Sequence, residues 1–218
     1  CPMNVDLARR NMVEQQIRPW EVLDARVLAA LSHIRRERFV PPGHEALAFA
    51  DLEIPLGHGE SMMAPRVEAR ILQELDLQPT DLVYEVGTGS GHLTALLARL
   101  GAQVTSAEIH DDFRRAAVAR LAAEGVRNVT LLGGDSALGP LGDGAYDAIV
   151  LTGSTPELPE AFVHALRPGG RLFAVVGELP VMRATLYRSQ AGGVVVETLF
   201  ETVLKPLAHA ARARRFRF

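Results

Sequence analysis

The pattern of apolar positions changes about one third of the way along the chain. Before that point, apolar residues recur every three or four positions over 4–16 and 24–36, the spacing of one face of an α-helix. The Arg18-Pro19-Trp20 break separates these two predicted helices. Val40-Pro41-Pro42 ends the second predicted helix, because a residue that precedes proline is disfavoured in the α region. Residues 43–64 show no clear period, and we expect irregular structure there.

A third helix is predicted to begin at Pro65, because proline is favoured in the first helical turn. Its apolar stripe is opposed by a charged one, with Val67, Ile71 and Leu75 against Arg66, Arg70 and Glu74. We therefore divide the chain at Gln78-Pro79 into an N-terminal helical segment, 1–78, and a core, 79–218, which together form one compact unit.

From residue 81 onward, short apolar runs alternate with helical stretches. The predicted strands are 82–86, 103–107, 129–132, 148–152 and 171–176, and the predicted helices between them are 91–100, 111–124 and 158–167. Two more runs, 183–188 and 194–203, fit a final hairpin around Ala191-Gly192-Gly193. This alternation predicts an α/β fold with a doubly wound, mostly parallel, seven-stranded sheet that helices cover on both faces.

Composition narrows the class of protein. The chain has 218 residues, 48% of them hydrophobic, which suffices for one core of ordinary size. Its formal net charge of -3 gives no general attraction to nucleic acid or to an anionic membrane. Cys1 is the only cysteine, so we expect no internal disulfide and a cytoplasmic location. No apolar run reaches the ~18 residues of a membrane span. Whether Cys1-Pro2 is native or Met3 is the natural start stays open.

The candidate chemistry begins at Glu85-Val86-Gly87-Thr88-Gly89-Ser90-Gly91, which ends the first predicted strand of the core. In a doubly wound sheet, ligands bind beyond the carboxyl ends of the strands. Glycines let the backbone turn sharply and approach a ligand, and the next helix offers its free amide groups. A glycine-rich connector without a ligand is the alternative, and for the loop alone the two are evenly matched.

Acidic residues at three strand ends favour a ligand. Glu108 ends the second strand, about 20 residues after the first loop glycine, where a carboxylate can bind ribose hydroxyls. Gly134-Asp135-Ser136 follows the third strand, and Glu85 ends the first. Because these strand ends meet at one edge of the sheet, a polar ligand explains them better than a connector does.

The form of the loop distinguishes between nucleotides. It reads G-x-G-x-G, and His92 stands where a dinucleotide loop has its third glycine. The lysine of a triphosphate loop is absent. Glu85 would repel a pyrophosphate but suits a cation, such as a sulfonium that carries an amino group. S-adenosyl-L-methionine is therefore the expected cofactor, with NAD as the alternative.

The same loop resembles the S-adenosylmethionine motif of the protein-L-isoaspartate O-methyltransferase family. Further segments resemble those of the family in its order, namely Val13-Glu14-Gln15-Gln16-Ile17, Arg36-Glu37-Arg38-Phe39-Val40-Pro41, Asp51-Leu52-Glu53-Ile54-Pro55-Leu56-Gly57, Gly133-Gly134-Asp135 and Pro168-Gly169-Gly170-Arg171-Leu172. The loop alone is general to methyltransferases, whereas the combination is far more specific.

The resemblance implies a Rossmann-like class I methyltransferase fold, with the N-terminal helices and the loop of the fifties over the substrate cleft. The family methylates the α-carboxylate of L-isoaspartyl residues in damaged proteins, which begins their repair. Isoaspartyl proteins or peptides are then the partners. The resemblance also implies a set of cofactor contacts: Gly87, Gly89 and Gly91 for the methionine part, Glu85 for its amino group, Glu108 for the ribose, Asp135 and Ser136 for the adenine, and Thr88, Ile109 and Thr152 beside them.

The acceptor segment departs from the family. Gly59-Glu60-Ser61-Met62-Met63-Ala64-Pro65 stands where the family usually has Gly-Gln-Thr-Ile-Ser-Gln-Pro. Ser61 keeps a hydroxyl, but Met63 replaces the serine thought to act on the acceptor, and a thioether cannot donate a hydrogen bond. Glu60 could repel an anionic acceptor. Ser61, His58 and backbone amides are the candidate donors, and packing is the simpler role for Met63.

Three function classes stay open: a protein-carboxyl methyltransferase, a methyltransferase for a small molecule or RNA, and a non-catalytic relative that binds the cofactor. The seven histidines show no metal-binding spacing, so no metal site is expected. His92 directly follows the glycine loop, so we expect it to lie beside the cleft. Trp20 is expected to pack the N-terminal helices onto the sheet. Nucleic acid is not an expected partner, although Arg212-Ala213-Arg214-Arg215-Phe216-Arg217-Phe218 could contact RNA or form a solvated tail.

Overall fold

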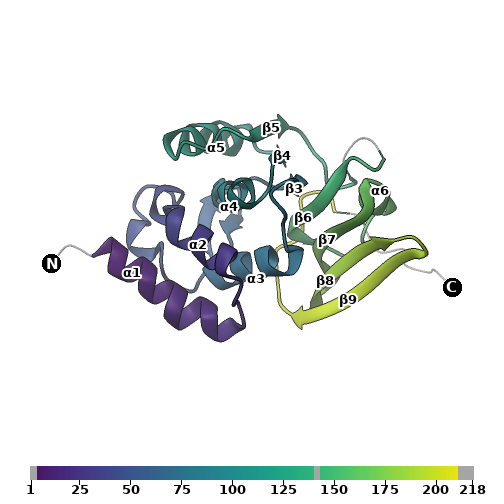
Figure 1. Cartoon of the computed structure of the whole chain (residues 1–218). Coiled ribbons are helices and arrows are strands. Elements are labelled where there is room, and N and C mark those ends of the chain that lie inside the picture. The colour runs from purple at the N-terminus through teal and green to yellow at the C-terminus, as the bar shows by residue number, and fades with distance from the viewer. Residues whose placement is uncertain (1–3, 140–142, 211–218) are drawn as a thin grey trace.

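A seven-stranded sheet forms the centre of the computed structural model, which describes residues 4–139 and 143–210 (Figure 1). Its order is β5-β4-β3-β6-β7-β8-β9. The strands are β3 (Leu82–Val86), β4 (Gln103–Glu108), β5 (Val129–Gly133), β6 (Tyr146–Thr155), β7 (Leu166–Glu178), β8 (Val181–Gln190) and β9 (Gly193–Glu201). β8 runs antiparallel to both its neighbours and the other pairs are parallel. The predicted sheet and its final hairpin are confirmed.

The chain reverses its direction of travel across the sheet at β3. From β3 it moves outward through β4 to β5, and then returns to the other side of β3 as β6. β3 and β6 are parallel neighbours, with Glu85 opposite Val150 and Val86 opposite Leu151. A crevice opens beyond the carboxyl ends of the strands at such a reversal, so the fold places a ligand site at the end of β3.

Helices cover both faces of this sheet. They are α1 (Val5–Met12), α2 (Ala25–His33), α3 (Pro65–Leu75), α4 (His92–Leu100), α5 (Asp111–Ala123) and α6 (Glu160–His164). Along β3 the side chains alternate between two cores, because successive residues of a strand point to opposite faces. Val83 belongs to the core that α1 to α4 share, whereas Tyr84 packs in the core that contains Phe162 of α6.

Local sequence explains where the first helices begin. The Asn4 side chain accepts a hydrogen bond from the Leu7 amide at 3.0 Å and caps α1. Asp24 caps α2, with its Oδ1 2.7 Å from the Arg26 amide. Pro65 is the first residue of α3, as predicted. Trp20 packs edge-on against Phe200 of β9, with ring centroids 5.5 Å apart, which confirms its predicted position between the N-terminal segment and the sheet.

Three sequence-based predictions of local structure need correction. The helix predicted over 4–16 is α-helical only to Met12 and continues as a π-helical turn, η1 (Val13–Ile17). The segment 43–64 is not wholly irregular, since it contains a hairpin of β1 (Ile54–Gly57) and β2 (Glu60–Met62). These strands are too short to show alternation. The helix predicted over 158–167 ends at His164, because β7 begins to pair with β6 at Leu166.

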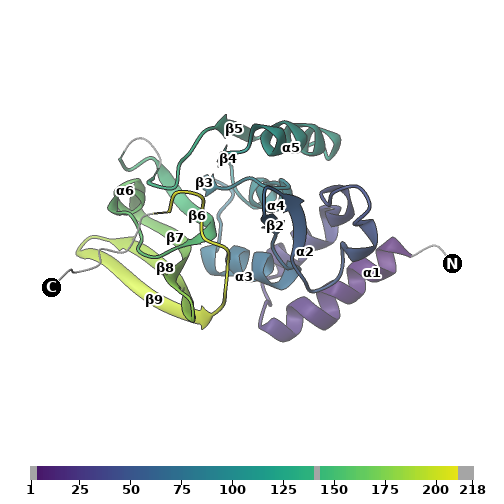
Figure 2. The same cartoon turned by 180° about the vertical axis from the view of Figure 1, so that it is seen from behind.

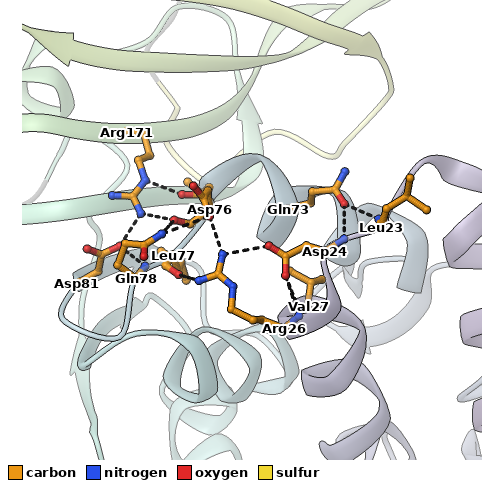
Figure 3. A network of polar contacts seen from close by, with 11 residues as sticks. Leu23, Asp24, Arg26, Val27, Gln73, Asp76, Leu77, Gln78, Asp81 and Arg171 are labelled. Atoms are coloured by element: carbon orange, nitrogen blue, oxygen red, sulfur yellow. Dashed lines mark hydrogen bonds and ion pairs between the residues drawn. The ribbon is translucent and has the colours of Figure 1, made fainter.

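A polar network ties the N-terminal helices to the amino-terminal side of the sheet (Figure 3). The Arg171 guanidinium of β7 donates to the Leu75 and Asp76 carbonyls at 2.5 and 2.6 Å and to the Asp81 carboxylate at 2.5 Å. Arg26 of α2 reaches the Asp76 carboxylate at 2.6 Å. The last carbonyls of α3 thereby gain cationic partners, which favours the helix C-terminus.

One buried apolar cluster runs from Met12 and Leu31 through Leu72 to Phe173 of the sheet. We propose on this basis that segments 1–78 and 79–218 fold as a single unit. In the described parts of the chain, the helices are all too short or too polar to cross a membrane. Cys1 and the Arg212–Phe218 run lie outside the described residues.

Candidate active site

A cleft opens at the carboxyl ends of β3, β4 and β6. It encloses about 830 Å³ including its open mouth, and a smaller cavity of about 280 Å³ adjoins it. Gly87, Glu108, Ile109, Leu207 and Ala208 line both spaces and so form the border between them. The combined site thus lies at the reversal in the sheet, where the fold predicts a ligand.

The loop after β3 turns sharply into this cleft. Gly87 and Gly89 have φ of +91° and +52°, in the region that favours glycine. A Cβ atom on Gly87 would overlap Thr152 Oγ1, which lies 2.7 Å from the Val86 carbonyl oxygen. Gly89 is less crowded, because its Cβ would meet only a Leu56 methyl group at 3.3 Å. The backbone at Gly87 is therefore the more tightly constrained of the two.

Glu85 is a buried carboxyl group with one oxygen free to meet a ligand. Its Oε2 accepts hydrogen bonds from Thr94 and Ser106 at 2.5 and 2.6 Å. Its Oε1 has no partner among the described residues, and Glu85 lines the cleft. Burial raises the pKa of Glu85 to about 8, so the group is largely protonated at neutral pH. A cation in the cleft would favour its ionised form.

The next strand end carries a carboxylate fixed by backbone amides. Glu108 is buried, with Oε2 2.8 Å from the Gly89 amide and Oε1 2.9 Å from the His110 amide. Each oxygen keeps a lone pair for a further donor. Glu108 therefore presents two hydrogen-bond-accepting oxygens at the border between the cleft and the smaller cavity.

The smaller cavity is lined by the residues that follow β5. Asp135 accepts from the Ala137 amide at 2.9 Å and pairs with His209 at 2.7 Å. These contacts, the backbone hydrogen bond first, hold the pKa of Asp135 below its ordinary value. Ser136 lies beside it in the same wall.

The opposite wall of the cleft comes from the β1–β2 hairpin and the residues after it. Ser61 lines the cleft and donates to Glu53 Oε2 at 2.7 Å. The Met63 side chain is buried against the same wall. His58 is not among the lining residues, since it stacks on His110 with centroids 4.2 Å apart and lies 3.0 Å from an Asp112 oxygen.

A buried ion pair supports this wall from behind. Arg36 is paired with Glu68, and its guanidinium also donates to the carbonyls of Met63 and Ala48 at 2.6 and 2.8 Å. Burial alone would raise the pKa of Glu68, but the Arg36 and His92 charges and hydrogen bonds outweigh it and lower that pKa. His92 is buried 2.9 Å from Glu68 and does not line the cleft.

A C-terminal segment, Leu204–Ala208, completes the cleft, and sequence reasoning missed it. It runs from the end of β9 across β6, where Figure 2 shows it in yellow. The Ser154 amide donates to the Lys205 carbonyl and the Leu207 amide to the Ser154 carbonyl, each at 2.9 Å. Gly153 is needed here, because a Cβ would lie 2.8 Å from a Leu207 methyl group. The segment has no periodic signal, but Lys205 is the only lysine in the chain.

The structure brings most of the sequence-predicted site residues together. Those that line the cleft or the smaller cavity are Ser61, Met63, Glu85, Gly87, Thr88, Gly89, Glu108, Ile109, Asp135, Ser136 and Thr152. Gly91 does not, because it precedes α4 and faces Ala117 of α5, 3.2 Å from where its Cβ would be. Within 4–139 and 143–210, no group of three or more His, Cys, Asp or Glu residues is arranged to hold a metal ion.

Known proteins resemble this chain along nearly its whole length. Residues 8–211 match the family described as Protein-L-isoaspartate(D-aspartate) O-methyltransferase. A protein-L-isoaspartate O-methyltransferase from Methanoculleus marisnigri is 41% identical over 78% of this chain and 77% of its own length. One from Gloeobacter violaceus is 34% identical over 90% of this chain and 96% of its own.

The fold has a counterpart among solved structures. A protein described as a protein-L-isoaspartate O-methyltransferase from Plasmodium falciparum, solved in complex with S-adenosyl-L-homocysteine, superposes with a TM-score of 0.80. The match covers 95% of this chain and 99% of that one at 20% identity. At that identity the likeness concerns the fold, and it agrees with the predicted α/β class.

Proposed function

The chain belongs to the protein-L-isoaspartate(D-aspartate) O-methyltransferase family, and we propose that it methylates the α-carboxylate of L-isoaspartyl residues in damaged proteins, with S-adenosyl-L-methionine as the methyl donor. Similarity over most of the chain supports the reaction. The observation in the structure that carries the proposal is the free, buried Glu85 oxygen in the cleft, beside a glycine turn and a fixed Glu108 carboxylate.

These residues suit the donor. Glu85 would bind its cationic amino group, and Glu108 its ribose hydroxyls. The remaining assigned contacts are Gly87 and Gly89 for the methionine part, Asp135 and Ser136 for the adenine, and Thr88, Ile109 and Thr152 beside them, whereas Gly91 faces α5 and is not assigned a contact. When bound, S-adenosylmethionine supplies a methyl group on a sulfonium whose leaving group is a neutral thioether.

The chain's own contribution is alignment and exclusion of water. An acceptor carboxylate is already ionised at neutral pH, so no general base is required. The β1–β2 hairpin and the Leu204–Ala208 segment wall the cleft on two sides, which limits the approach of water and fixes the direction from which an acceptor enters. Ser61 is the assigned hydroxyl donor on the acceptor side. Met63 and His58 contribute packing at and beside this wall.

The cellular setting is part of the proposal. We place the protein in the cytoplasm, because a chain with Cys1 as its only cysteine suits a reducing compartment. Its partners would be proteins and peptides that carry isoaspartyl residues. Nucleic acid is not assigned as a partner, since the net charge of -3 offers no general attraction to phosphates.

Transfer of labelled methyl groups tests the function. The protein is incubated with labelled S-adenosylmethionine and a peptide that contains L-isoaspartate, with its L-aspartyl twin as the matched control. We expect a base-labile methyl ester on the first peptide only. Absence of ester on either peptide at saturating cofactor would overturn the proposal. A labelled small molecule or RNA would then support the alternative acceptor, and cofactor binding without any acceptor would support a non-catalytic relative.

A further inference from the structure

Lys205 stands out in both sequence and structure. The chain contains 23 lysine and arginine residues, and Lys205 is the only lysine among them. It lies in the C-terminal segment and lines the cleft. Its backbone carbonyl accepts from the Ser154 amide at 2.9 Å, which fixes the residue beside the end of β6. Its side chain crosses to the hairpin on the facing wall.

The ionisable side chains that line the cleft are mostly acidic. Five carboxyl groups line it, those of Glu53, Glu60, Glu68, Glu85 and Glu108. Lys205 is the only lysine or arginine among the lining residues of the described chain. Arg36, whose guanidinium lies behind the wall, is buried and already paired with Glu68. An anionic acceptor that enters this cleft therefore has one ammonium group to meet.

The Lys205 ammonium has capacity for a further partner. It donates to the Gly59 carbonyl at 2.9 Å and to Glu60 Oε1 at 2.5 Å. An ammonium has three protons, so a third is free to reach into the cleft. The side chain is 44% exposed and that of Glu60 27%, so water and ligand can reach the pair. A solvent-exposed pair of this kind is weak and easily exchanged.

We propose that Lys205 binds the acceptor carboxylate of the isoaspartyl substrate, and that Glu60 is an internal anion which competes with this carboxylate for the same ammonium. The assignment rests on the proposed function and names a specificity-determining residue for it. It also accounts for a cleft in which Met63, a side chain without a donor, lines the acceptor wall. The ammonium supplies the donor that the thioether lacks.

A purely structural role for Lys205 makes a different prediction. If the Lys205–Glu60 pair only held the hairpin closed, removing either partner would weaken the cleft in the same direction. If Glu60 competes with the acceptor, removing its charge has the opposite effect from removing Lys205. The sign of the Glu60→Gln effect therefore distinguishes the two roles.

Steady-state kinetics of three variants measure this sign. For Lys205→Gln we expect the KM for an isoaspartyl peptide to rise about tenfold or more, because a charge-assisted hydrogen bond is lost. The Kd for S-adenosylhomocysteine should stay within about twofold. For Glu60→Gln we expect the KM to fall about threefold. Lys205→Arg should recover part of the loss, since it restores the charge with a different reach.

Arg127→Gln is the matched control. Arg127 is exposed in the loop before β5, on the amino-terminal side of the sheet, and it does not line the cleft. The variant changes the net charge by the same unit as Lys205→Gln, so we expect its KM to equal that of the parent. A similar rise in KM for Arg127→Gln and Lys205→Gln would show that the effect comes from the change in net charge alone, and it would overturn the assignment.

A single lysine also permits a direct observation of contact. Protein labelled with ¹³C at lysine Cε gives one side-chain signal, which belongs to Lys205. In the presence of S-adenosylhomocysteine we expect this signal to shift on addition of isoaspartyl peptide and to stay unchanged with the aspartyl twin. A bound peptide that leaves the signal unmoved would overturn the role of Lys205.

The two proposals fail in distinguishable ways. If the parent protein methylates the isoaspartyl peptide but Lys205→Gln leaves its KM unchanged, or Glu60→Gln raises that KM, only the Lys205 assignment falls. If the parent protein neither methylates nor binds the peptide, the proposed function falls and takes the assignment with it.

Discussion

The two walls of the cleft are built in different ways. On the donor wall, Glu85 and Glu108 are 0% and 4% exposed, and their oxygens are fixed by hydroxyls or backbone amides. On the acceptor wall, which we take as the β1–β2 hairpin together with the Leu204–Ala208 segment, Ser61 and Lys205 are held by the side chains of the exposed Glu53 and the half-buried Glu60. A wall fixed by buried hydrogen bonds presents one arrangement, whereas solvent-accessible side-chain pairs can exchange for contacts with a ligand. Substitutions in the donor wall should therefore strongly weaken binding of the donor. Substitutions in the acceptor wall should raise or lower the affinity for the acceptor.

The acceptor wall nevertheless has a rigid foundation, and its removal should have the largest effect. Arg36→Met would leave the Glu68 carboxylate buried without its ion-pair partner and the Met63 carbonyl without a donor. We expect a loss of about 3–5 kcal/mol in the free energy of unfolding, measured by urea denaturation. Arg38→Met is the control, because Arg38 is 46% exposed and 3.2 Å from Glu124, and it should cost at most about 1 kcal/mol. Equal losses in the free energy of unfolding for the two variants would show that the buried Arg36–Glu68 pair does not support this wall.

On the donor wall, the most damaging single methyl group should be the one added at Gly87. Gly87→Ala forces a side chain toward Thr152 at a φ of +91°. We expect the Kd for S-adenosylhomocysteine to rise tenfold or more, since such strain costs about 1–3 kcal/mol. Gly89→Ala is the matched variant, with a φ of +52° and only a Leu56 methyl group nearby, and should weaken binding less. Calorimetric titration gives both values, and the reverse order would contradict the geometry.

The buried Glu85 should make the free energy of unfolding depend on pH. Its pKa of about 8 lies above its ordinary value of 4.5, so its contribution to stability is complete below about pH 4.5 and is lost as the pH rises through about 8. Glu85→Gln should flatten that decline in an unfolding series from pH 5 to 9.

The same pKa predicts release of a proton on donor binding. The amino cation favours ionised Glu85, so binding at pH 7 should expel its proton. Calorimetry in two buffers that differ in ionisation enthalpy measures the number of protons released per ligand bound. The same measurement on Glu85→Gln gives the number that the ligand itself releases. Equal proton counts in the two proteins would mean that Glu85 is not the linked group.

The smallest expected effect comes from a change at Met63. Met63→Ser supplies the hydroxyl common at this position in the family, but Lys205 already provides a donor to the acceptor carboxylate. We expect the KM for isoaspartyl peptide to change by no more than about threefold, because a second, neutral donor should add only the lower end, about 0.5 kcal/mol, of what a neutral hydrogen bond contributes. A much larger fall in KM would assign the missing donor to residue 63 rather than to Lys205.

The same contrast explains what the sequence could predict. The donor wall lies in contiguous motifs at strand ends, so Glu85, Gly87 and Glu108 were placed correctly in one cleft. The sheet was predictable because its buried strands are nearly continuous apolar runs. Such features depend on neighbours in sequence, and a pattern along the chain records them.

The acceptor wall depends on contacts between distant parts of the chain. Lys205 and Glu60 are 145 residues apart, and no local pattern indicates that they meet. His58 was predicted to contact the acceptor, but its stacking on His110 sets it outside the cleft lining. The short β1–β2 hairpin also went unpredicted, because strands of four and three residues carry too little periodicity.

A crossed binding experiment tests the division of the cleft most directly. Calorimetry measures the Kd of S-adenosylhomocysteine, and then that of isoaspartyl peptide at saturating S-adenosylhomocysteine, for Gly87→Ala and Lys205→Gln. The account predicts that Gly87→Ala weakens S-adenosylhomocysteine tenfold or more and the peptide by less than about threefold, and that Lys205→Gln does the reverse. If each variant weakened both ligands equally, the two walls would not be separate sites for donor and acceptor.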